Sequence, residues 1–230
     1  MSQWTQTTVS RLTHVRSLRR ERDAEPGLGA RVRAVKQFQH TRFARDYAAL
    51  LADPRYSGAV SFFLDELYGP GDFATRDAEF ERVVPWMAHV LPDDAMRTIA
   101  DLIELHSLTE ELDQRMAAAL SSANLDERSY RDAWQVVGRR VDRERQLALL
   151  LSTGRALDRH TRSRLLAATL RAMRAPAHAA GLGHLQVFLE AGMGAFAGMR
   201  GAGEFLAFID ANESRTIDQL FIPQMKNPTE

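Results

Sequence analysis

Apolar residues recur three or four positions apart along almost the whole chain, which is the spacing of one face of an α-helix. No convincing run of alternating apolar and polar residues, the pattern of a half-buried β-strand, occurs anywhere. The pattern therefore predicts an all-α fold, a bundle-like domain of about eight to nine helices. After a short N-terminal helix, the spacing predicts helices over residues 30–51, 54–68, 73–90, 93–120, 124–151, 158–175, 181–199 and 203–221.

Breaks in this pattern divide the chain into four parts. Proline and glycine at residues 25–29 end a basic amphipathic segment, residues 1–27. The polar run at residues 121–124 is the clearest internal break, and Asn124 with Glu127 predicts a capping box there. We expect one helical half over residues 28–122, a second over 123–222 that packs with the first as one unit, and a polar tail over 223–230.

Residues 62–73, which read FFLDELYGPGDF, form the stretch around which the rest of the chain is expected to be organised. Asp53 and Pro54 favour a helix start before it, and Gly-Pro-Gly at 69–71 ends that helix because proline cannot continue the hydrogen bonding. Its aromatic side chains are large enough to form either a packing corner or the floor of a ligand pocket. These residues are Phe62, Phe63, Tyr68 and Phe73.

The same run, followed by ERVVPWMAHVLP and IELHSLTEELD, resembles an uncharacterised family of all-helical proteobacterial proteins. The likeness is concentrated in residues 62–113, and EFLAFIDANESRTIDQLF near the end fits it as well. The resemblance implies a helical fold and a bacterial, cytoplasmic origin. It implies no catalytic residue, because no activity is attached to that family.

Composition is ordinary for a soluble globular protein, with 45% hydrophobic and 26% charged residues among 230. The absence of cysteine excludes disulfides, thiolate metal sites and cysteine nucleophiles, and it fits the cytoplasm. Net charge is zero but uneven: +6 over residues 1–60, −10 over 61–126, +7 over 127–175 and −3 over the remainder. Such blocks favour contacts between segments, within the chain or between subunits, and no nucleic-acid partner is expected.

Residues 7–22 combine spaced apolar residues with several arginines. The segment lacks a long apolar run, so it is not a secretory signal, and no transmembrane segment is expected in the chain. Two interpretations remain: a docked N-terminal helix, or a helix that lies on an acidic membrane surface or partner.

The familiar motifs of catalysis and cofactor binding are absent. The chain has no Glu-x-x-His or His-Glu-x-x-His pair, no glycine-rich nucleotide loop and no Gly-x-Ser-x-Gly elbow. We therefore expect no metal site and no cofactor.

His106 is the histidine that best fits a ligand role, because it lies at the edge of an apolar stripe with Glu110 one turn later. A histidine on a long helix that faces an aromatic corner is how a globin presents its haem ligand. Haem binding is therefore the alternative to a hydrogen-bonded structural role for this residue. The carboxylates that an unfamiliar enzyme could use near the corner are Asp65, Glu66, Asp77 and Glu81.

Residues 181–199 are rich in glycine for a helix, although each glycine costs about 1 kcal/mol relative to alanine. Such a cost predicts the close approach of another helix, across a homodimer axis for example, or of a ligand in a groove. The small residues that would form the contact are Ala191, Gly194, Ala195 and Gly198.

Three functions fit these observations, in the following order. The first is a non-catalytic interaction or regulatory module that binds a protein partner or forms a homodimer. The second is a globin-like module that binds haem or a small molecule with His106 as ligand. The third is an enzyme of unfamiliar type that uses carboxylates near residues 62–73.

Overall fold

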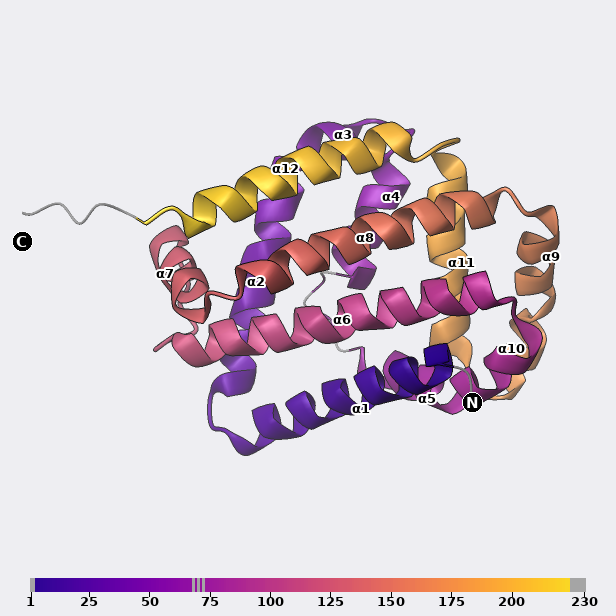
Figure 1. Ribbon diagram of the computed structural model, residues 1–230, viewed down its shortest axis with the longest axis horizontal. Helices are drawn as coiled ribbons and strands as arrows, with labels where there is room; N and C mark the ends of the chain where they lie inside the picture. Colours follow the sequence, from indigo (N-terminus) through magenta and orange to yellow (C-terminus); the bar gives the residue numbers. More distant parts are fainter. Residues whose placement is uncertain (1–2, 68, 70, 72, 224–230) are drawn as a thin grey trace, which may run out of the picture.

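The computed structural model describes residues 3–67, 69, 71 and 73–223, and over these it is all-helical (Figure 1). The all-α prediction is confirmed. The prediction of eight to nine helices is wrong, because the described residues form twelve α-helices and one π-helical turn. They are α1 (Gln3–Ala24), α2 (Leu28–Asp46), α3 (Ala48–Ala52), α4 (Ser57–Phe62), the π turn η1 (Phe63–Leu67), α5 (Ala74–Val90), α6 (Asp93–Ala119), α7 (Glu127–Val137), α8 (Arg140–Thr161), α9 (Arg164–Ala172), α10 (Arg174–Ala179), α11 (Gly183–Gly198) and α12 (Gly203–Phe221).

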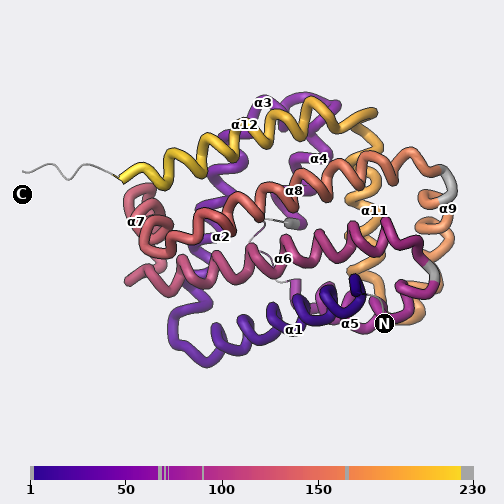
Figure 2. Tube along the Cα trace, in the orientation of Figure 1, coloured from indigo at the N-terminus to yellow at the C-terminus, as the bar shows by residue number. Residues whose placement is uncertain are grey.

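Four long helices lie side by side in one layer, in the order α12, α8, α6 and α1. Figure 2 shows the same layer as a tube, with α2 and α11 crossing behind it. Helix α6 is central to this arrangement, since it contacts α1, α2, α5, α7 and α8.

Three apolar clusters form the core. One joins α4, η1, α8, α11 and α12, the second joins α1, α5, α6 and α11, and the third joins α2, α6, α7 and α12. Each cluster contains residues from before and after residue 122. The segments on either side of this position therefore cover each other's apolar side chains. The four-part division of the chain stays a prediction.

The long helix predicted over residues 124–151 is interrupted. Gly138 has φ +66° and Arg139 has φ +50°, and these left-handed residues separate α7 from α8. The capping box that opens α7 uses Asp126 and Ser129, two residues beyond the predicted pair. The apolar spacing continues across this turn and therefore predicted a single helix. Val141, one of the residues in that spacing, is 77% exposed in the structure.

The helix predicted to start at Asp158 does not start there. Asp158 lies within the last turns of α8, where its Oδ1 accepts a hydrogen bond from the Ala202 backbone N–H at 3.1 Å. The next helix, α9, begins after Ser163, whose hydroxyl accepts from the Leu166 N–H at 3.2 Å. A further break at Met173 separates α10.

The aromatic corner also differs from the prediction in its details. The Asp53 carboxylate accepts from the Arg55 N–H at 2.8 Å in a turn, and α4 begins only at Ser57. Gly69 lies so close to the preceding π turn that an added Cβ would be 2.5 Å from the Asp65 carbonyl oxygen, which explains glycine at that position. Tyr68, Pro70 and Asp72 lie outside the described residues.

The N-terminal helix is docked. The buried face of α1 contains Leu12, Val15 and Leu18, and α1 packs against α5 and α6. Contact of residues 7–22 with a membrane surface would therefore have to use the remaining, arginine-rich face. Among the described residues, no helix combines the length and the apolar character needed to cross a bilayer.

Candidate functional site

A buried ionic network lies where α1, α2, α5 and α6 meet. On α6, His106 Nε2 is 2.8 Å from Asp77 Oδ2 of α5, and the two side chains are only 9% and 6% exposed. Asp77 also accepts from Arg19 of α1, at 2.5 Å. Burial alone would raise the pKa of Asp77, but His106 and Arg19 outweigh burial and hold that pKa below its ordinary value.

One turn later on α6, Glu110 binds two cations from different helices. Its Oε1 accepts a short hydrogen bond from Lys36 of α2, and its Oε2 lies 2.6 Å from Arg22 Nη2 of α1. Burial alone would raise the pKa of Glu110, but the attraction of Lys36 above all lowers it well below the usual range. Glu110 is therefore a buried carboxylate that stays ionised and ties three helices together.

Asp113, a further turn on, behaves differently. It is buried, and its Oδ1 accepts a hydrogen bond of 3.0 Å from the neutral side chain of Gln39. Burial raises the pKa of Asp113, and the nearby charges of Lys36 and Arg143 compensate only in part.

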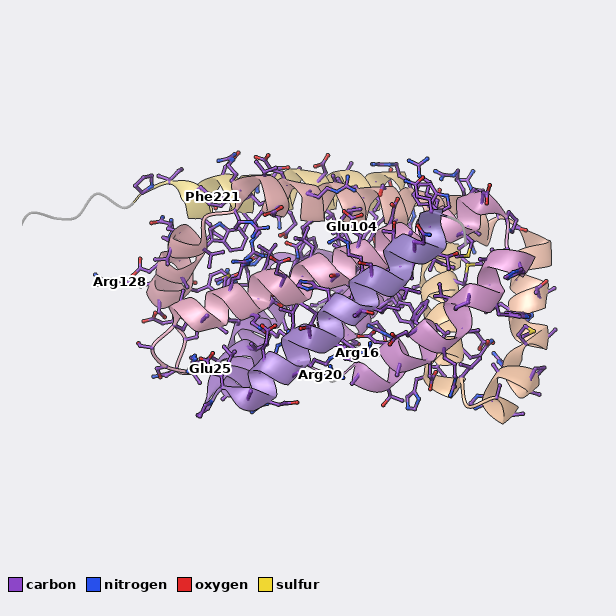
Figure 3. All side chains as sticks on the ribbon, turned by 60° about the horizontal axis from the view of Figure 1, so that its bottom comes forward. Arg16, Arg20, Glu25, Glu104, Arg128 and Phe221 are labelled. Atoms are coloured by element: carbon purple, nitrogen blue, oxygen red, sulfur yellow. The ribbon has the colours of Figure 1, made fainter. Side chains whose placement is uncertain are left out.

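These contacts show where the charge blocks meet. Basic residues of α1 and α2 face acidic residues of α5 and α6. Figure 3 shows how α1, which carries Arg16, lies along α6. Arg16, for example, donates to Glu81 at 2.8 Å. The blocks of opposite charge that the sequence revealed are thus paired within the chain.

The aromatic side chains that were predicted to form one pocket contact different parts of the core. Phe62 packs against Phe188, with ring centres 5.5 Å apart, whereas Phe63 enters another cluster, against Phe196 and Phe205. Of the three that the structure describes, only Phe73 approaches His106, edge to face at 6.3 Å. Tyr68 lies outside the described residues.

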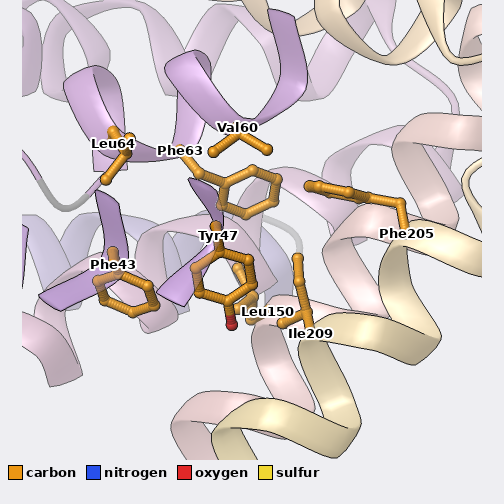
Figure 4. Close-up of a pocket in the computed structure, with 8 residues that line it drawn as sticks. All are labelled: Phe43, Tyr47, Val60, Phe63, Leu64, Leu150, Phe205 and Ile209. Atoms are coloured by element: carbon orange, nitrogen blue, oxygen red, sulfur yellow. The ribbon is translucent and has the colours of Figure 1, made fainter. Parts of the chain in front are cut away.

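A small cavity borders Phe63 and holds about 30 Å³. Figure 4 shows the side chains around it, among them Tyr47 and Phe205, which converge on one apolar space. Small-molecule sites usually hold about 300–1,000 Å³. The cavity has room for a water-sized occupant and is not lined by His106.

The predicted carboxylates do not converge either. Asp77 belongs to the network, Glu81 pairs with Arg16, Glu66 Oε2 lies 3.6 Å from Arg76 Nη1, and Asp65 is exposed. Among the described residues, no group of three or more histidine, aspartate and glutamate side chains is arranged to hold a metal ion.

A larger groove lies beside the network, between the start of α5 and the α10–α11 connection, and it holds about 670 Å³. It is lined by Glu66, Phe73, Thr75, Arg76, Glu79, His178, Gly181, Gly183, His184, Val187 and Phe188. The sequence pointed to Phe73 and Glu66 of this groove but not to Arg76 or to the α11 residues. The available signal was Arg76 next to Asp77 at the start of a predicted helix. This signal does not reveal that Phe188 of α11 packs against the arginine.

The small residues predicted to form an interface lie on two faces of α11. Ala191, Gly194 and Gly198 are exposed, whereas Ala195 is half-buried and packs against the core. An added Cβ at Gly194 or Gly198 would meet nothing within 4 Å, but one at Gly192 would be 3.0 Å from the Phe62 ring.

Comparison with known proteins identifies a family but no function. A family model described as a domain of unknown function (DUF8198) matches residues 18–227, so the chain belongs to this family. No curated protein and no solved structure matches the chain. Membership of a family without an assigned function agrees with the resemblance noted above, and the proteobacterial origin stays a prediction.

Proposed function

We propose that this member of the family is a non-catalytic interaction module that self-associates through one exposed face of α11. That face, called the α11 seam below, consists of His184, Val187, Ala191, Gly194 and Gly198. Its exposure, in a helix that has apolar residues on all sides, is the observation that carries the proposal.

The spacing of the seam is 3-4-3-4, the repeat with which one helix packs along another. The seam contains no aspartate, glutamate, lysine or arginine, and Glu190 is the one such residue in all of α11. A helix that is apolar on all sides is normally buried. The inner face of α11 is buried in the core, so the seam is the face that lacks a cover.

The glycines of the seam support contact with another helix. Nothing in the rest of the described chain approaches the Cβ position of Gly194 or Gly198, so packing within one chain does not require glycine there. Each glycine nevertheless costs the helix up to about 1 kcal/mol relative to alanine. Close approach of a helix from another molecule would explain why glycine occurs at these two positions in spite of its cost.

A second copy of the chain fits this surface. In an antiparallel pair whose two-fold axis passes beside Ala191 and Gly194, Val187 of one copy lies opposite Gly198 of the other. The Val187 side chain then fills the gap left by Gly198, on both sides of the axis. Because one helix face is smaller than a standard interface, we expect a weak, concentration-dependent dimer.

The test is the mass of the protein in solution, measured by sedimentation over a range of concentrations up to about 1 mM. We expect a monomer–dimer equilibrium for the wild type and a monomer for Gly194→Leu, which prevents close approach. Gly58→Leu is the matched control, because Gly58 is also a helical glycine with nothing within 4 Å of an added Cβ, but it lies in α4. A monomeric wild type, or equal association of both variants, contradicts self-association through the seam.

A further inference from the structure

We propose that the groove between α5 and the α10–α11 connection binds a small molecule that carries a carboxylate on a flat apolar body, with Arg76 as the anchor. This inference concerns a single chain and does not rest on self-association, although His184 and Val187 border both surfaces.

Arg76 is held as a rigid, nearly dry cation. Its guanidinium carbon lies 4.2 Å from the centre of the Phe73 ring and 4.5 Å from that of Phe188. The side chain is 9% exposed and lines the groove. Contact with two aromatic rings restricts the guanidinium, so its donors are placed before a ligand arrives.

Part of this donor set has no partner among the described residues. Nη1 donates to the Glu66 carbonyl oxygen at 2.9 Å, and Nε lies 3.7 Å from Asp77 Oδ1, beyond hydrogen-bond range. No hydrogen bond or ion pair involves Nη2 within the part of the chain that the structure describes. Burial lowers the pKa of Arg76, and Asp77 and Glu66 compensate only in part, so a ligand carboxylate would supply the missing counter-charge.

The two acidic residues of the groove leave room for such a ligand. Glu79 is already engaged: its Oε2 accepts from the Leu185 N–H at 2.7 Å, and its Oε1 lies 2.9 Å from His184 Nδ1. Glu66 Oε2 stands 3.6 Å from Arg76 Nη1, a loose contact that a well-placed carboxylate can replace.

The rest of the groove favours an apolar body on that carboxylate. Phe73, Phe188 and Val187 provide apolar walls, and Val187 is 57% exposed. A volume of about 670 Å³ is in the range of small-molecule sites. Inorganic anions would use the arginine but leave these walls in contact with water.

Benzoate is a suitable probe, with neutral benzamide and inorganic phosphate for comparison, and binding is measured by ligand-observed NMR titration. We expect saturable benzoate binding with a dissociation constant of about 1 mM, and binding at least about tenfold weaker for benzamide and for phosphate. Arg76→Gln should weaken benzoate binding at least about tenfold, because the ionic donor is lost.

A second variant keeps the test decisive if Arg76→Gln does not fold. Thr75 is exposed in the first turn of α5 and lines the groove, so Thr75→Glu places a competing carboxylate there without disturbing the core. Thr13→Glu, on the exposed side of α1 and outside the groove, is the matched control. Benzoate binding should fall in Thr75→Glu and stay unchanged in Thr13→Glu.

Three results overturn the groove assignment: no saturation by benzoate up to about 20 mM, phosphate binding tighter than benzoate binding, or Thr75→Glu binding like the wild type. Titration of Gly194→Leu separates this inference from the proposed function. Unchanged benzoate binding by that variant is expected, and loss of binding contradicts a site built by one chain.

Discussion

Helices α6 and α11 differ from an ordinary amphipathic helix in opposite ways. Helix α6 buries charge: Glu110 and Asp113 are 2% and 1% exposed, in the middle of the molecule. Helix α11 exposes apolar surface, with the seam from His184 to Gly198 facing solvent. Each arrangement is unfavourable unless a partner compensates for it.

The compensation is found inside the chain for α6 but not for α11. Lys36 and Arg22 reach Glu110 from two other helices, and Arg19 reaches Asp77, so the network holds the bundle together. His184 pairs with Glu79 at one end of the seam, but an added Cβ at Gly194 or Gly198 would meet no neighbour among the described residues. A buried charge that is paired within the chain serves to hold helices together, whereas an apolar face without a cover indicates an interaction outside the chain.

The largest expected effect comes from removing the charge of Glu110. Glu110→Gln leaves Lys36 buried without its counter-charge, and we expect a loss of about 3 kcal/mol in the free energy of unfolding. Asp113→Asn is the matched control on the same helix, since Asn keeps the acceptor for Gln39 and removes a charge that burial disfavours. It should change stability by less than about 1 kcal/mol. Urea denaturation measures both, and equal losses would contradict the distinction between the two carboxylates.

The two faces of α11 are separated by a second pair of variants. Gly192→Leu drives a side chain into the Phe62 ring and should destabilise the protein by about 2 kcal/mol or more. Gly194→Leu adds the same side chain to open space and should leave stability unchanged or raise it. Thermal unfolding at low protein concentration, where dimers do not contribute, compares them directly. A loss at both positions would show that the seam is already covered within the chain.

Acid should weaken the network by about 1 kcal/mol between pH 5 and pH 3. The pKa values of Glu110 and Asp77 are lower in the folded protein than in the unfolded chain. Their contribution to stability is therefore complete above the unfolded-state pKa and is lost as pH falls towards the folded-state pKa. Urea titrations across this range should give a smaller loss for Glu110→Gln than for the wild type, and parallel curves would exclude Glu110 as a contributor.

The smallest change in stability is expected for Gly194→Ala and Gly198→Ala, which also test self-association most directly. In the monomer each should raise stability by about 0.5–1 kcal/mol, because alanine is the better helix former and meets no neighbour. The same substitutions should weaken self-association, since two added methyl groups hold the helices apart. Unfolding and sedimentation of the same samples give both quantities. Increased stability with unchanged association would argue against the seam.

Much of the fold could be predicted from local signals. The spacing of apolar residues indicated α5, α6, α11 and α12 within a few residues of their bounds, because amphipathic periodicity and the proline–aspartate start of α6 are local properties. The spacing could not reveal the breaks at Gly138 and Met173, because apolar residues on both sides keep the same period through a turn. The short helices α3 and α10 were missed for the same reason.

The candidate sites likewise have some features that the sequence shows and others that depend on packing. Glycines and alanines four apart in α11 are visible in the sequence, and so is His106 with Glu110 one turn later. Which side of α11 faces solvent depends on the packing of α4, α5 and α8 against this helix, and the sequence does not show that packing.

Only packing brings Asp77 to His106 and places the Arg76 guanidinium against both Phe73 and Phe188. These contacts join residues between 3 and 112 positions apart in the chain. Local sequence patterns thus indicate most of the helical segments and the chemical groups that each one carries. Packing determined which groups meet, because burial and ion pairing act between helices that are distant in the chain.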